Sequence, residues 1–431
     1  MTAHVAQPAE PVCLTQPAEP ICLTQPEGPV CLAQPGGPIR LARRMARVQP
    51  SAVRDLLRLG ADPTVTSFGG GYPDAGLFPL AGLAEIYREA IAESGRETLQ
   101  YSVPEGISRL REQVAARMAQ DGMPTAPDEV LILQGGQQGL DLAGRMLIDP
   151  GDIVITENPT FLGALLAFDP NEPRYLGIDM DGEGMDMVAL EAALVANPGA
   201  RVLYTVPDFH NPAGVTMSLA RRQRLMELAN RHDLVVLEDA PYRALRYEGV
   251  APPTLRSMDT EGRVIHFGSF SKILVPGMRL GWAVGAPALI ERLGLLKLAA
   301  DTQSSTINMV AASRFLDRFD IDAHIVTIRD AYRHKRDVML AALRRHFPQD
   351  IGFTEPAGGM FTWLTFPEGF DAAAFMRDHA LPEARVAYVP GATFFPVEQR
   401  SNHARLSFTT NSDADIERGI AALGVLLRAR R

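Results

Sequence analysis

The chain has 431 residues, of which 46% are hydrophobic and 22% charged, so it has the length of about two domains and the composition of a globular protein. Its 42 basic and 51 acidic side chains give a net charge of −9, which argues against nucleic acid or an anionic membrane surface as a partner. No apolar run reaches the roughly 18 residues of a membrane span, and the first residues lack the basic-then-apolar pattern of a secretion signal, so we expect a cytoplasmic protein.

A nonapeptide is repeated four times over residues 7–42, QPAEPVCLTQPAEPICLTQPEGPVCLAQPGGPIRLA, and it contains all three cysteines, Cys13, Cys22 and Cys31. An extended chain separates neighbouring cysteines by about 30 Å, whereas a zinc site normally uses close pairs such as Cys-x-x-Cys, so neither a metal site nor a disulfide framework is expected. Each unit carries a Pro-x-x-Pro pattern, which favours extended structure without a core of its own. We therefore expect residues 1–44 to be a disordered leader, with a docking arm as the alternative.

Helix and strand patterns follow the repeat. Residues 43–60 have the pattern of an amphipathic helix, and the Gly- and Pro-rich residues 68–79 are too irregular for a regular element. From residue 83, short apolar strands alternate with helical stretches such as residues 218–232, for which Ser218 is a plausible N-cap. This alternation predicts a parallel-dominated sheet covered by helices on both faces. The expected strands are residues 130–133, 153–156, 202–206, 234–239, 264–269 and 280–285.

After about residue 305 the pattern changes. A long helical stretch runs through residues 330–347, strand-like segments follow at 360–366 and 405–410, and a terminal helix is expected over 413–430. These elements predict a second, smaller α+β domain. The expected division is a leader (1–44), an N-terminal segment that packs with the small domain (45–82), a large domain (83–304) and a small domain (305–431).

The segment GSFSKILVPGMRLGW (268–282) follows an expected strand and is the most informative part of the chain. Lys272 lies beside Ser269 and Ser271, and Arg279 follows seven positions later. A lone lysine after a strand is usually a surface residue. This spacing, however, suits a phosphorylated aldehyde cofactor, because an amine can bond the aldehyde while hydroxyls and a guanidinium hold phosphate oxygens.

Two further segments belong at the carboxyl edge of the expected sheet. Asp239 ends the strand LVVLED (234–239), at the edge where parallel sheets bind ligands, although capping a helix is an equally simple explanation. The segment LILQGGQQGLDLAGRML (131–147) has the pattern of a strand, a glycine turn and a helix start. Backbone N–H groups at such a helix start bind phosphate without specialised side chains.

Together with PDFHNPAG (207–214), PGDIVITENPTF (150–161) and HARLSFTTNSDADIERGI (403–420), these segments resemble the ordered motifs of the class I/II aminotransferases of pyridoxal-phosphate (PLP) fold type I. The pattern is most similar to the branch with the α-aminoadipate and aromatic aminotransferases, and it runs from about Ala46 to the C-terminus. The resemblance implies an α/β fold: a large domain with a mostly parallel seven-stranded sheet sandwiched by helices, plus a smaller α+β domain. It also implies PLP as the cofactor, with Lys272 bonding its aldehyde and moving the proton of the substrate Cα.

The resemblance assigns roles around the cofactor ring. Asp239 would pair with the pyridinium nitrogen and keep it protonated, so that the ring can accept electrons. Tyr242 and Asn211 would hydrogen-bond the 3′ oxygen. Phe161 would stack on the ring where relatives commonly have tyrosine, so stacking is kept while any role of a phenol hydroxyl is lost.

The cofactor phosphate is expected to contact two segments and a partner subunit. Relatives commonly have serine at the position of Gly136, so backbone amides must contribute more here. Tyr101 matches a tyrosine that reaches across a dimer interface to the neighbouring subunit's phosphate, which implies a homodimer with shared active sites. The other phosphate-binding residues implied by the resemblance are Gly135, Gln137, Ser269, Ser271 and Arg279.

Substrate recognition is expected from residues at both ends of the chain. Arg405 would grip the α-carboxylate of the amino acid, because a planar guanidinium suits a bidentate carboxylate contact, although an arginine in a surface ion pair is the alternative. Asn211 and the backbone of Gly71 would lie close to the same carboxylate. Tyr72 stands where relatives usually have an aliphatic residue, so the side-chain pocket is expected to differ. His210 needs no role beyond its loop position, and the histidines and carboxylates have no metal-ligand spacing.

The sequence thus predicts a PLP-dependent aminotransferase that works by two half-reactions, with 2-oxoglutarate or pyruvate as acceptor, in amino-acid or secondary-metabolite biosynthesis. Another PLP reaction on the same fold, such as β-elimination, cyclisation or oxidation, is the main alternative, because these enzymes share the same motifs. A transcriptional regulator with a PLP-type sensor domain is disfavoured, since only 44 residues precede the matching region and they contain no basic recognition helix. The amino donor stays open.

Overall fold

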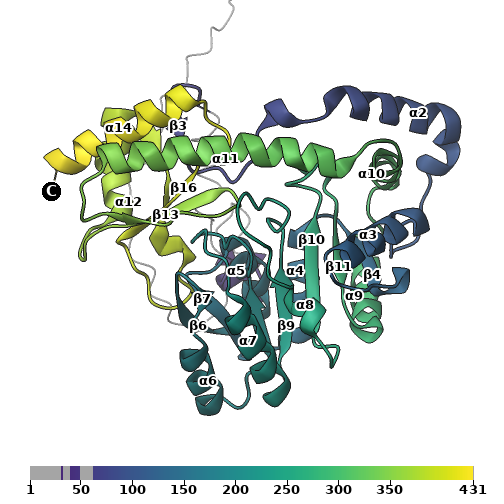
Figure 1. Cartoon of the computed structure of the whole chain (residues 1–431). Helices are drawn as coiled ribbons and strands as arrows, with labels where there is room; N and C mark the ends of the chain where they lie inside the picture. The colour runs from purple at the N-terminus through teal and green to yellow at the C-terminus, as the bar shows by residue number, and fades with distance from the viewer. Residues whose placement is uncertain (1–30, 33–38, 49–61, 431) are drawn as a thin grey trace, which may run out of the picture. The chain divides into compact units, whose positions relative to one another are not determined.

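The computed structural model describes three stretches of the chain, residues 31–32, 39–48 and 62–430 (Figure 1). They belong to two compact units, Met1–Ala46 and Arg47–Arg431. Within the described stretches, no helix combines the length and the apolar character that crossing a membrane requires.

The described residues of the first unit form short elements. β1 (Cys31–Leu32) pairs antiparallel with β2 (Ile39–Arg40), and the 3-10 turn η1 (Arg43–Ala46) follows. Cys13, Cys22 and most of the repeat lie outside the described residues, as does most of the helix expected over 43–60, whose described beginning is this 3-10 turn. The disorder of the leader therefore stays a prediction.

The second unit contains an eight-stranded sheet with the order β4-β11-β10-β9-β8-β5-β6-β7. The strands from β10 to β6 are parallel, β11 is antiparallel to both of its neighbours, and β7 is antiparallel to β6. The mostly parallel seven-stranded sheet is confirmed, with the two-residue β7 as an addition at its edge. The strands are β4 (Val130–Leu133), β5 (Ile153–Asn158), β6 (Arg174–Asp181), β7 (Gly184–Met185), β8 (Val202–Thr205), β9 (Val235–Asp239), β10 (Val264–Ser269) and β11 (Gly281–Val284).

All six strands expected from the sequence are present, whereas β6 was missed. The expected strands are runs of buried apolar residues, as strands covered on both faces must be. In β6 only Ile178 is fully buried, so this strand near the sheet edge has no apolar run that would reveal it.

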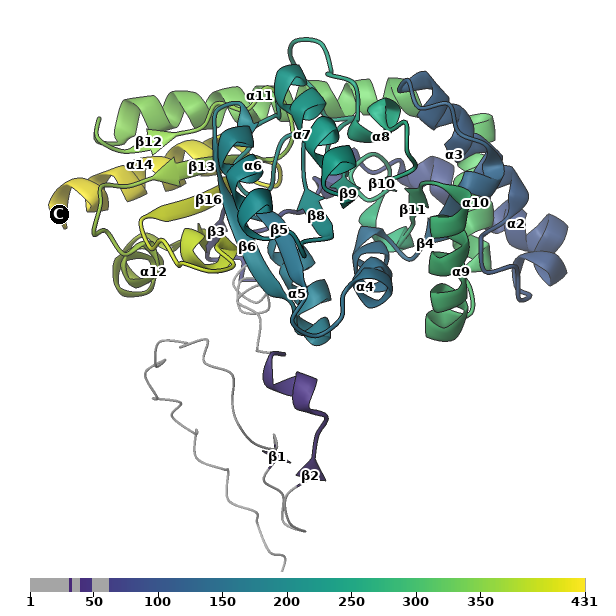
Figure 2. The same cartoon turned by 90° about the horizontal axis from the view of Figure 1, so that it is seen from below.

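Helices cover both faces of this sheet, because successive residues of a strand point to opposite sides. Tyr204 and Leu237 pack into a core with α4, α5 and α9, while their neighbours Leu203 and Val236 pack with α6, α7 and α8. Figure 2 shows the two helix layers on either side of the strands. The predicted helix over 218–232 is α7, and the Ser218 side chain caps it as expected. The helices are α4 (Gly136–Leu147), α5 (Leu162–Phe168), α9 (Pro287–Asp301), α6 (Met187–Ala196), α7 (Leu219–Arg231) and α8 (Leu255–Met258).

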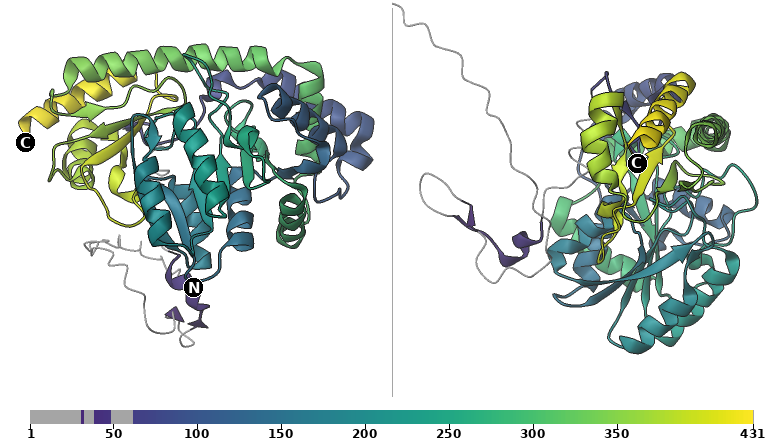
Figure 3. Two further views of the ribbon diagram at one scale, coloured as in Figure 1. Left: turned by 60° about the horizontal axis from the view of Figure 1, so that its bottom comes forward. Right: turned by 90° about the vertical axis from the view of Figure 1, so that its left-hand side faces the viewer.

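A second, antiparallel sheet with the order β12-β13-β16-β15 forms the C-terminal part of this unit. The long helix α11 packs on the terminal helix α14, and Figure 3 shows the two side by side. The strands are β12 (Gly352–Phe353), β13 (Phe361–Thr365), β15 (Val389–Pro390) and β16 (His403–Ser407). The helices are α10 (Thr306–Arg318), α11 (Ile321–His346), α12 (Ala372–Phe375), the π turn η6 (Met376–Ala380), α13 (Leu381–Ala384), η7 (Gly391–Phe394) and α14 (Asp413–Ala429).

The N-terminal segment of this unit is tied to distant parts of the chain. β3 (Thr66–Ser67) pairs parallel with β14 (Val386–Ala387). The helix α2 (Leu80–Thr98) packs on α10, as does α3 (Ser108–Gln120). Arg47–Arg431 form one compact unit without an internal division. The domain boundaries expected near residues 82 and 304 therefore stay predictions.

The carboxyl ends of the parallel strands meet at one edge of the main sheet. Asp239 ends β9, Ser269 ends β10, and the loop after β8 leads to Asn211. Gly135 follows β4 at the start of α4, while Arg405 lies on β16 of the second sheet. This edge is where open parallel sheets bind ligands.

Candidate active site

A cavity of about 430 Å³ lies at this edge of the main sheet. The residues that the sequence assigned to cofactor and substrate all line it, except Tyr101 and Gly135. Gly135 lies directly beside the cavity, next to Gly136. The lining residues among those predicted are Gly71, Tyr72, Gly136, Gln137, Phe161, Asn211, Asp239, Tyr242, Ser269, Ser271, Lys272, Arg279 and Arg405.

Lys272 lies in the turn that follows β10, and its amine faces the cavity. Its Nζ donates a hydrogen bond of 2.8 Å to the carbonyl oxygen of Gly71. Burial lowers the pKa of Lys272 to about 8, and the positive charges of Arg405 and Arg279 act in the same direction. An amine with this pKa is partly unprotonated near neutral pH, so Lys272 can act both as a nucleophile and as a base.

Asp239 presents a buried carboxylate to the same cavity. Burial raises its pKa to about 6, although a hydrogen bond from Tyr204 opposes the shift. The Tyr204 hydroxyl donates to Oδ2 of Asp239 at 2.8 Å. The carboxylate therefore has one strong protein donor and is suited to pair with a cationic group of a ligand.

Tyr204 is a site residue that sequence reasoning missed. Its side chain is fully buried, and burial together with the nearby Asp239 raises the pKa of its hydroxyl well above the usual range, so it stays a proton donor. The available signal was chemical: Tyr204 is the only hydroxyl-bearing aromatic residue in the strand VLYT, and a buried tyrosine hydroxyl normally needs a partner. Nothing in the sequence indicated that Asp239 would be this partner.

Asn211 connects Tyr242 to Arg405. Its Nδ2 donates to the Tyr242 hydroxyl at 3.2 Å, and its Oδ1 accepts from Arg405 Nη1 at 2.8 Å. Arg405 Nη2 donates to the carbonyl oxygen of Gly69 at 2.7 Å. Burial raises the pKa of Tyr242 to about 12, against the effect of Arg405, and lowers that of Arg405 to about 10. The three side chains thus form one rigid polar wall.

Arg405 also lies over two aromatic rings. Its guanidinium carbon is 4.3 Å from the ring centre of Phe361 and 5.2 Å from that of Phe394. Its Nε is buried and has no hydrogen-bond partner. This arginine is therefore not the surface ion pair that was the alternative, and it has capacity for an anionic group in the cavity.

The opposite end of the cavity offers hydrogen-bond donors. Gly136 begins α4 and lines the cavity together with Gln137, so the start of this helix, where N–H groups lack intrahelical partners, lies at the cavity. Gly135 adopts a positive φ of 80°, and a Cβ there would lie 2.6 Å from Nη2 of Arg279, so glycine is required for this close approach. The hydroxyl of Ser269 accepts from the N–H of Ser271 at 3.0 Å and donates only a long hydrogen bond of 3.5 Å to the carbonyl oxygen of Leu280, so its proton can turn to a ligand oxygen. These donors and the Arg279 guanidinium suit a phosphate group.

A buried acid–histidine pair supports the loop that carries Asn211. His210 Nε2 lies 3.2 Å from Oε2 of Glu157, and both side chains are almost fully buried. Glu157 also accepts from the Thr205 hydroxyl at 2.5 Å, while His210 Nδ1 accepts from the N–H of Ala213 at 3.2 Å. The expectation that a loop position alone explains His210 is incomplete, because its buried ring lies beside Glu157 of β5.

The remaining wall of the cavity is apolar. Phe161 lies in it, and a Cβ on Gly163 would approach the Phe161 ring to 2.5 Å. A Cβ on Gly71 would lie 3.0 Å from the Phe361 ring, so the backbone here passes close to the aromatic wall. The other large apolar residues of this wall are Leu140, Leu162, Leu166, Val389 and Phe394, together with the half-exposed Tyr72.

Tyr101 is the predicted residue that this chain does not bring to the cavity. It is 81% exposed, and its neighbours Leu99 and Val103 are 66% and 51% exposed. Its expected role depends on a partner subunit, so it stays a prediction.

Comparison with known proteins agrees with this geometry. Residues 64–423 match the family "Aminotransferase class I and II". The chain is 39% identical to aromatic-amino-acid aminotransferase 1 of Thermococcus litoralis over 386 residues, which cover 88% of this chain and 92% of the relative. It is 38% identical to 2-aminoadipate transaminase of Thermus thermophilus over 385 residues, which cover 89% and 95%.

A solved structure has the same fold. The kynurenine aminotransferase of Pyrococcus horikoshii, in complex with PMP, KYN and KYA, matches with a TM-score of 0.86 and 38% identity over 90% of this chain and 97% of that one. The range matched by the family contains every residue that lines the cavity.

Proposed function

The chain belongs to the class I and II aminotransferases, and from this premise we propose which of its residues carry out the reaction. The enzyme moves an amino group between an amino acid and a 2-oxo acid, with PLP as its cofactor, on the PLP type I fold. The observation that carries the residue assignment is the convergence of Lys272, Asp239 and Arg405 on one cavity.

The residues around the cavity fit PLP group by group. When bound, PLP supplies a ring that withdraws electrons from the substrate Cα. Asp239 would hold the proton on the ring nitrogen, because its buried carboxylate has one protein donor and faces the cavity. Asn211 and Tyr242 would donate to the ring hydroxyl, and Phe161 would cover one face of the ring. The phosphate would contact Gly136, Gln137, Ser269, Ser271 and Arg279, beside Gly135.

Lys272 would bond the aldehyde carbon and later carry the proton of the substrate Cα on its Nζ. A lowered pKa is required for both tasks, since only the neutral amine attacks a carbonyl or accepts a proton. Burial and the two nearby arginines supply this pKa of about 8. The hydrogen bond from Nζ to the Gly71 carbonyl holds the amine at the cavity wall until the ligand arrives.

Arg405 would bind the α-carboxylate of both substrates through its guanidinium, with Asn211 and the backbone of Gly71 beside it. The apolar wall then faces the substrate side chain. We propose an aromatic or large aliphatic amino acid as the donor, because Phe361, Phe394 and Tyr72 border this space. The aromatic substrates named for the relatives support this choice. The proposed acceptor is 2-oxoglutarate or pyruvate.

The test is a donor screen with 2-oxoglutarate and pyruvate as acceptors, with detection of the amino-acid product. We expect Lys272→Ala to abolish turnover and the matched control Lys335→Arg, outside the cavity, to retain it. Release of ammonia without an acceptor would instead indicate another PLP reaction.

The composition allows a direct test of the lysine as well. The chain has only three lysines, Lys272, Lys297 and Lys335. Borohydride reduction of the holoenzyme, followed by peptide mass spectrometry, should place the cofactor mass on Lys272 alone. A label on Lys297 or Lys335 would contradict the assignment.

We also propose a homodimer in which Tyr101 reaches the phosphate of the partner's site. The exposed apolar residues Leu99 and Val103 beside it support a subunit contact there. Mixing inactive Lys272→Ala chains with weakened Tyr101→Ala chains tests this, because a shared site restores one intact site per mixed dimer. If each site belongs to one chain, mixing restores no activity.

A further inference from the structure

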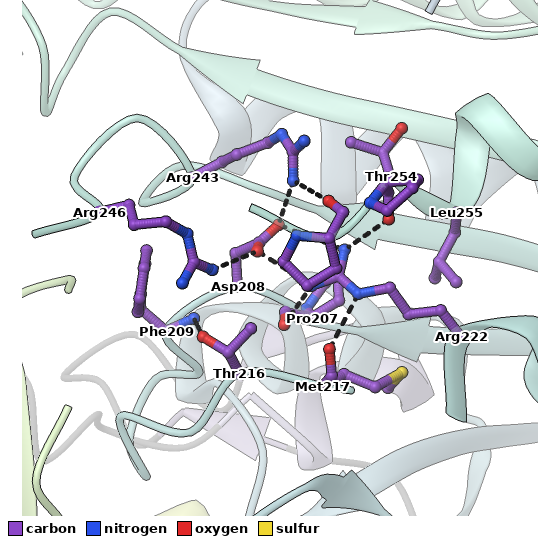
Figure 4. A network of polar contacts seen from close by, with 12 residues as sticks. Pro207, Asp208, Phe209, Thr216, Met217, Arg222, Arg243, Arg246, Thr254 and Leu255 are labelled. Atoms are coloured by element: carbon purple, nitrogen blue, oxygen red, sulfur yellow. Dashed lines mark hydrogen bonds and ion pairs between the residues drawn. The ribbon is translucent and has the colours of Figure 1, made fainter. Parts of the chain in front are cut away.

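Behind the loops that follow β8 and β9, three arginines surround one aspartate (Figure 4). Asp208 is fully buried, and its carboxylate accepts from Arg222 Nη2 at 2.9 Å and from Arg243 Nη1 at 3.1 Å. Arg246 Nη2 lies 3.5 Å from the same carboxylate, and its guanidinium carbon is 4.6 Å from the centre of the Phe209 ring. One negative charge thus faces three positive charges.

The three arginines differ in how many of their N–H groups have hydrogen-bond partners. Arg222 is fully buried, and its guanidinium also donates to the carbonyl oxygens of Met217, Pro207 and Pro253. In Arg243 and Arg246, by contrast, Nε is buried without a hydrogen-bond partner, as is Nη2 of Arg246. Burial lowers the pKa of Arg246, against the opposing effect of Asp208. Arg243 and Arg246 share Asp208 with Arg222 and also donate to the carbonyl oxygens of Pro252 and Glu248. Because buried N–H groups of both arginines still lack acceptors, this side of the cluster has capacity for an anion.

A cavity of about 250 Å³ borders Arg243 and Arg246. It lies between the end of α3, the loop after β9 and the first half of α11, and Arg117 and Arg329 also line it. Figure 4 shows the guanidinium groups of Arg243 and Arg246 both directed toward Asp208.

Two carboxylates also border the cavity. Asp322 lies 3.0 Å from Nη2 of Arg117, and Asp121 lies 3.8 Å from Nε of Arg243. With Arg222 and Asp208 included, five arginines face three aspartates, which leaves two positive charges unmatched among these residues.

We propose that this arginine cavity, formed by Arg117, Arg243, Arg246 and Arg329, binds a phosphate-type dianion. Two unmatched positive charges balance a phosphate dianion, and planar guanidinium groups bind tetrahedral oxyanions through paired hydrogen bonds. The volume admits a phosphate group and its remaining water shell. The site is separate from the proposed cofactor phosphate site, since the two cavities share no lining residue.

The arginine cavity is connected to the active site along the chain. Arg243 directly follows Tyr242, and Asp208 precedes Asn211 by three residues. A phosphate that holds Arg243 and Arg246 therefore stabilises both loops that carry donors for the cofactor ring. We expect bound phosphate to raise the thermal stability of the enzyme, because a ligand that binds the folded state shifts the folding equilibrium.

The test is a calorimetric titration of inorganic phosphate into the full-length holoenzyme at pH 8, with sodium chloride at equal ionic strength as the reference. PLP already occupies the active site in the holoenzyme, so that site does not contribute a phosphate signal. We expect saturable binding of one phosphate per chain. Arg329→Gln should weaken it about tenfold, since one charged hydrogen-bond partner is lost. The control Arg333→Gln, exposed on the same helix and outside the cavity, should bind as the wild type does.

A variant that is expected to raise the phosphate affinity separates the proposal from the effects of folding defects. Asp121→Asn removes a negative charge from the cavity, so phosphate should bind more tightly than in the wild type. No phosphate binding above the chloride reference, or equal affinity in Arg329→Gln and the wild type, would overturn the proposal. Competition by glycerol 3-phosphate would assign the site to phosphate esters, and its absence would assign it to the free ion.

Discussion

Glu238 and Asp239 are consecutive residues of β9, both buried, and the pKa values of their carboxyl groups are shifted in opposite directions. Glu238 accepts from the N–H groups of Leu255 and Arg256 at 2.8 and 3.0 Å, and His266 Nδ1 lies 3.0 Å from it. Burial alone would raise the pKa of Glu238, but His266, the positive charge of Arg222 and the Arg256 N–H lower it to about 2. Its partners are complete, so Glu238 joins β9 to β10 and to α8.

Asp239 points to the other face of the sheet, as strand geometry requires, and lines the cavity. Its one strong donor is Tyr204, and burial raises its pKa to about 6. The two carboxylates are buried to a similar extent, so what distinguishes Glu238 from Asp239 is the number of their hydrogen-bond partners. A carboxylate whose partners are all protein groups serves the fold, whereas one that is left incomplete beside a cavity is available for a ligand.

The strongest test of this comparison is Asp239→Asn. A neutral amide cannot hold the proton of the cofactor ring nitrogen, so we expect turnover to fall by about a thousandfold. The folded protein should be at least as stable as the wild type, since an incomplete buried carboxylate is removed. Steady-state kinetics and urea denaturation of the same preparation check both parts, and nearly normal turnover would contradict the assignment.

Glu238→Gln should have the reverse effect. It breaks a complete buried network, so we expect the free energy of unfolding to fall by about 3 kcal/mol. Turnover per folded molecule should stay close to that of the wild type, because Glu238 does not border the cavity. Urea denaturation measures the loss, and a selective loss of turnover without lost stability would contradict the comparison.

The two variants should also depend on pH in opposite directions in the apoenzyme. The pKa of Asp239 is raised from 3.8 to about 6, so wild-type stability attributable to this group falls as the pH rises through that window. The advantage of Asp239→Asn should therefore grow, by up to about 3 kcal/mol, from pH 4 to pH 6 and then level off. The pKa of Glu238 is lowered from 4.5 to about 2, so the cost of Glu238→Gln should be full above pH 4.5 and vanish toward pH 2.

Only part of the difference between Glu238 and Asp239 could be predicted from the sequence. The spacing of Asp239 and Tyr242 matched a family motif, and apolar runs predicted six of the eight strands of the main sheet, all except β6 and the two-residue β7. Nothing near Glu238 in the chain indicated His266 or the N-terminus of α8 as its partners, because these contacts form only when strands and loops come together. The same holds for Tyr204 on Asp239 and for Arg222 on Asp208. Strand β6, which lies next to the edge strand β7, was missed for a different reason, since its partly exposed residues form no buried apolar run.

Tyr204→Phe is the finest test, because it changes the partners of Asp239 without changing its charge. Loss of the hydroxyl removes the hydrogen bond that opposes the effect of burial, so the pKa of Asp239 should rise further. We expect turnover at neutral pH to fall by about tenfold, the equivalent of one hydrogen bond to a charged group, and to recover in part as the pH increases. A carboxyl-carbon NMR titration of the apoenzyme measures the pKa directly, without reference to activity. A purely structural role for Tyr204 would lower stability and leave both the Asp239 pKa and the pH profile unchanged.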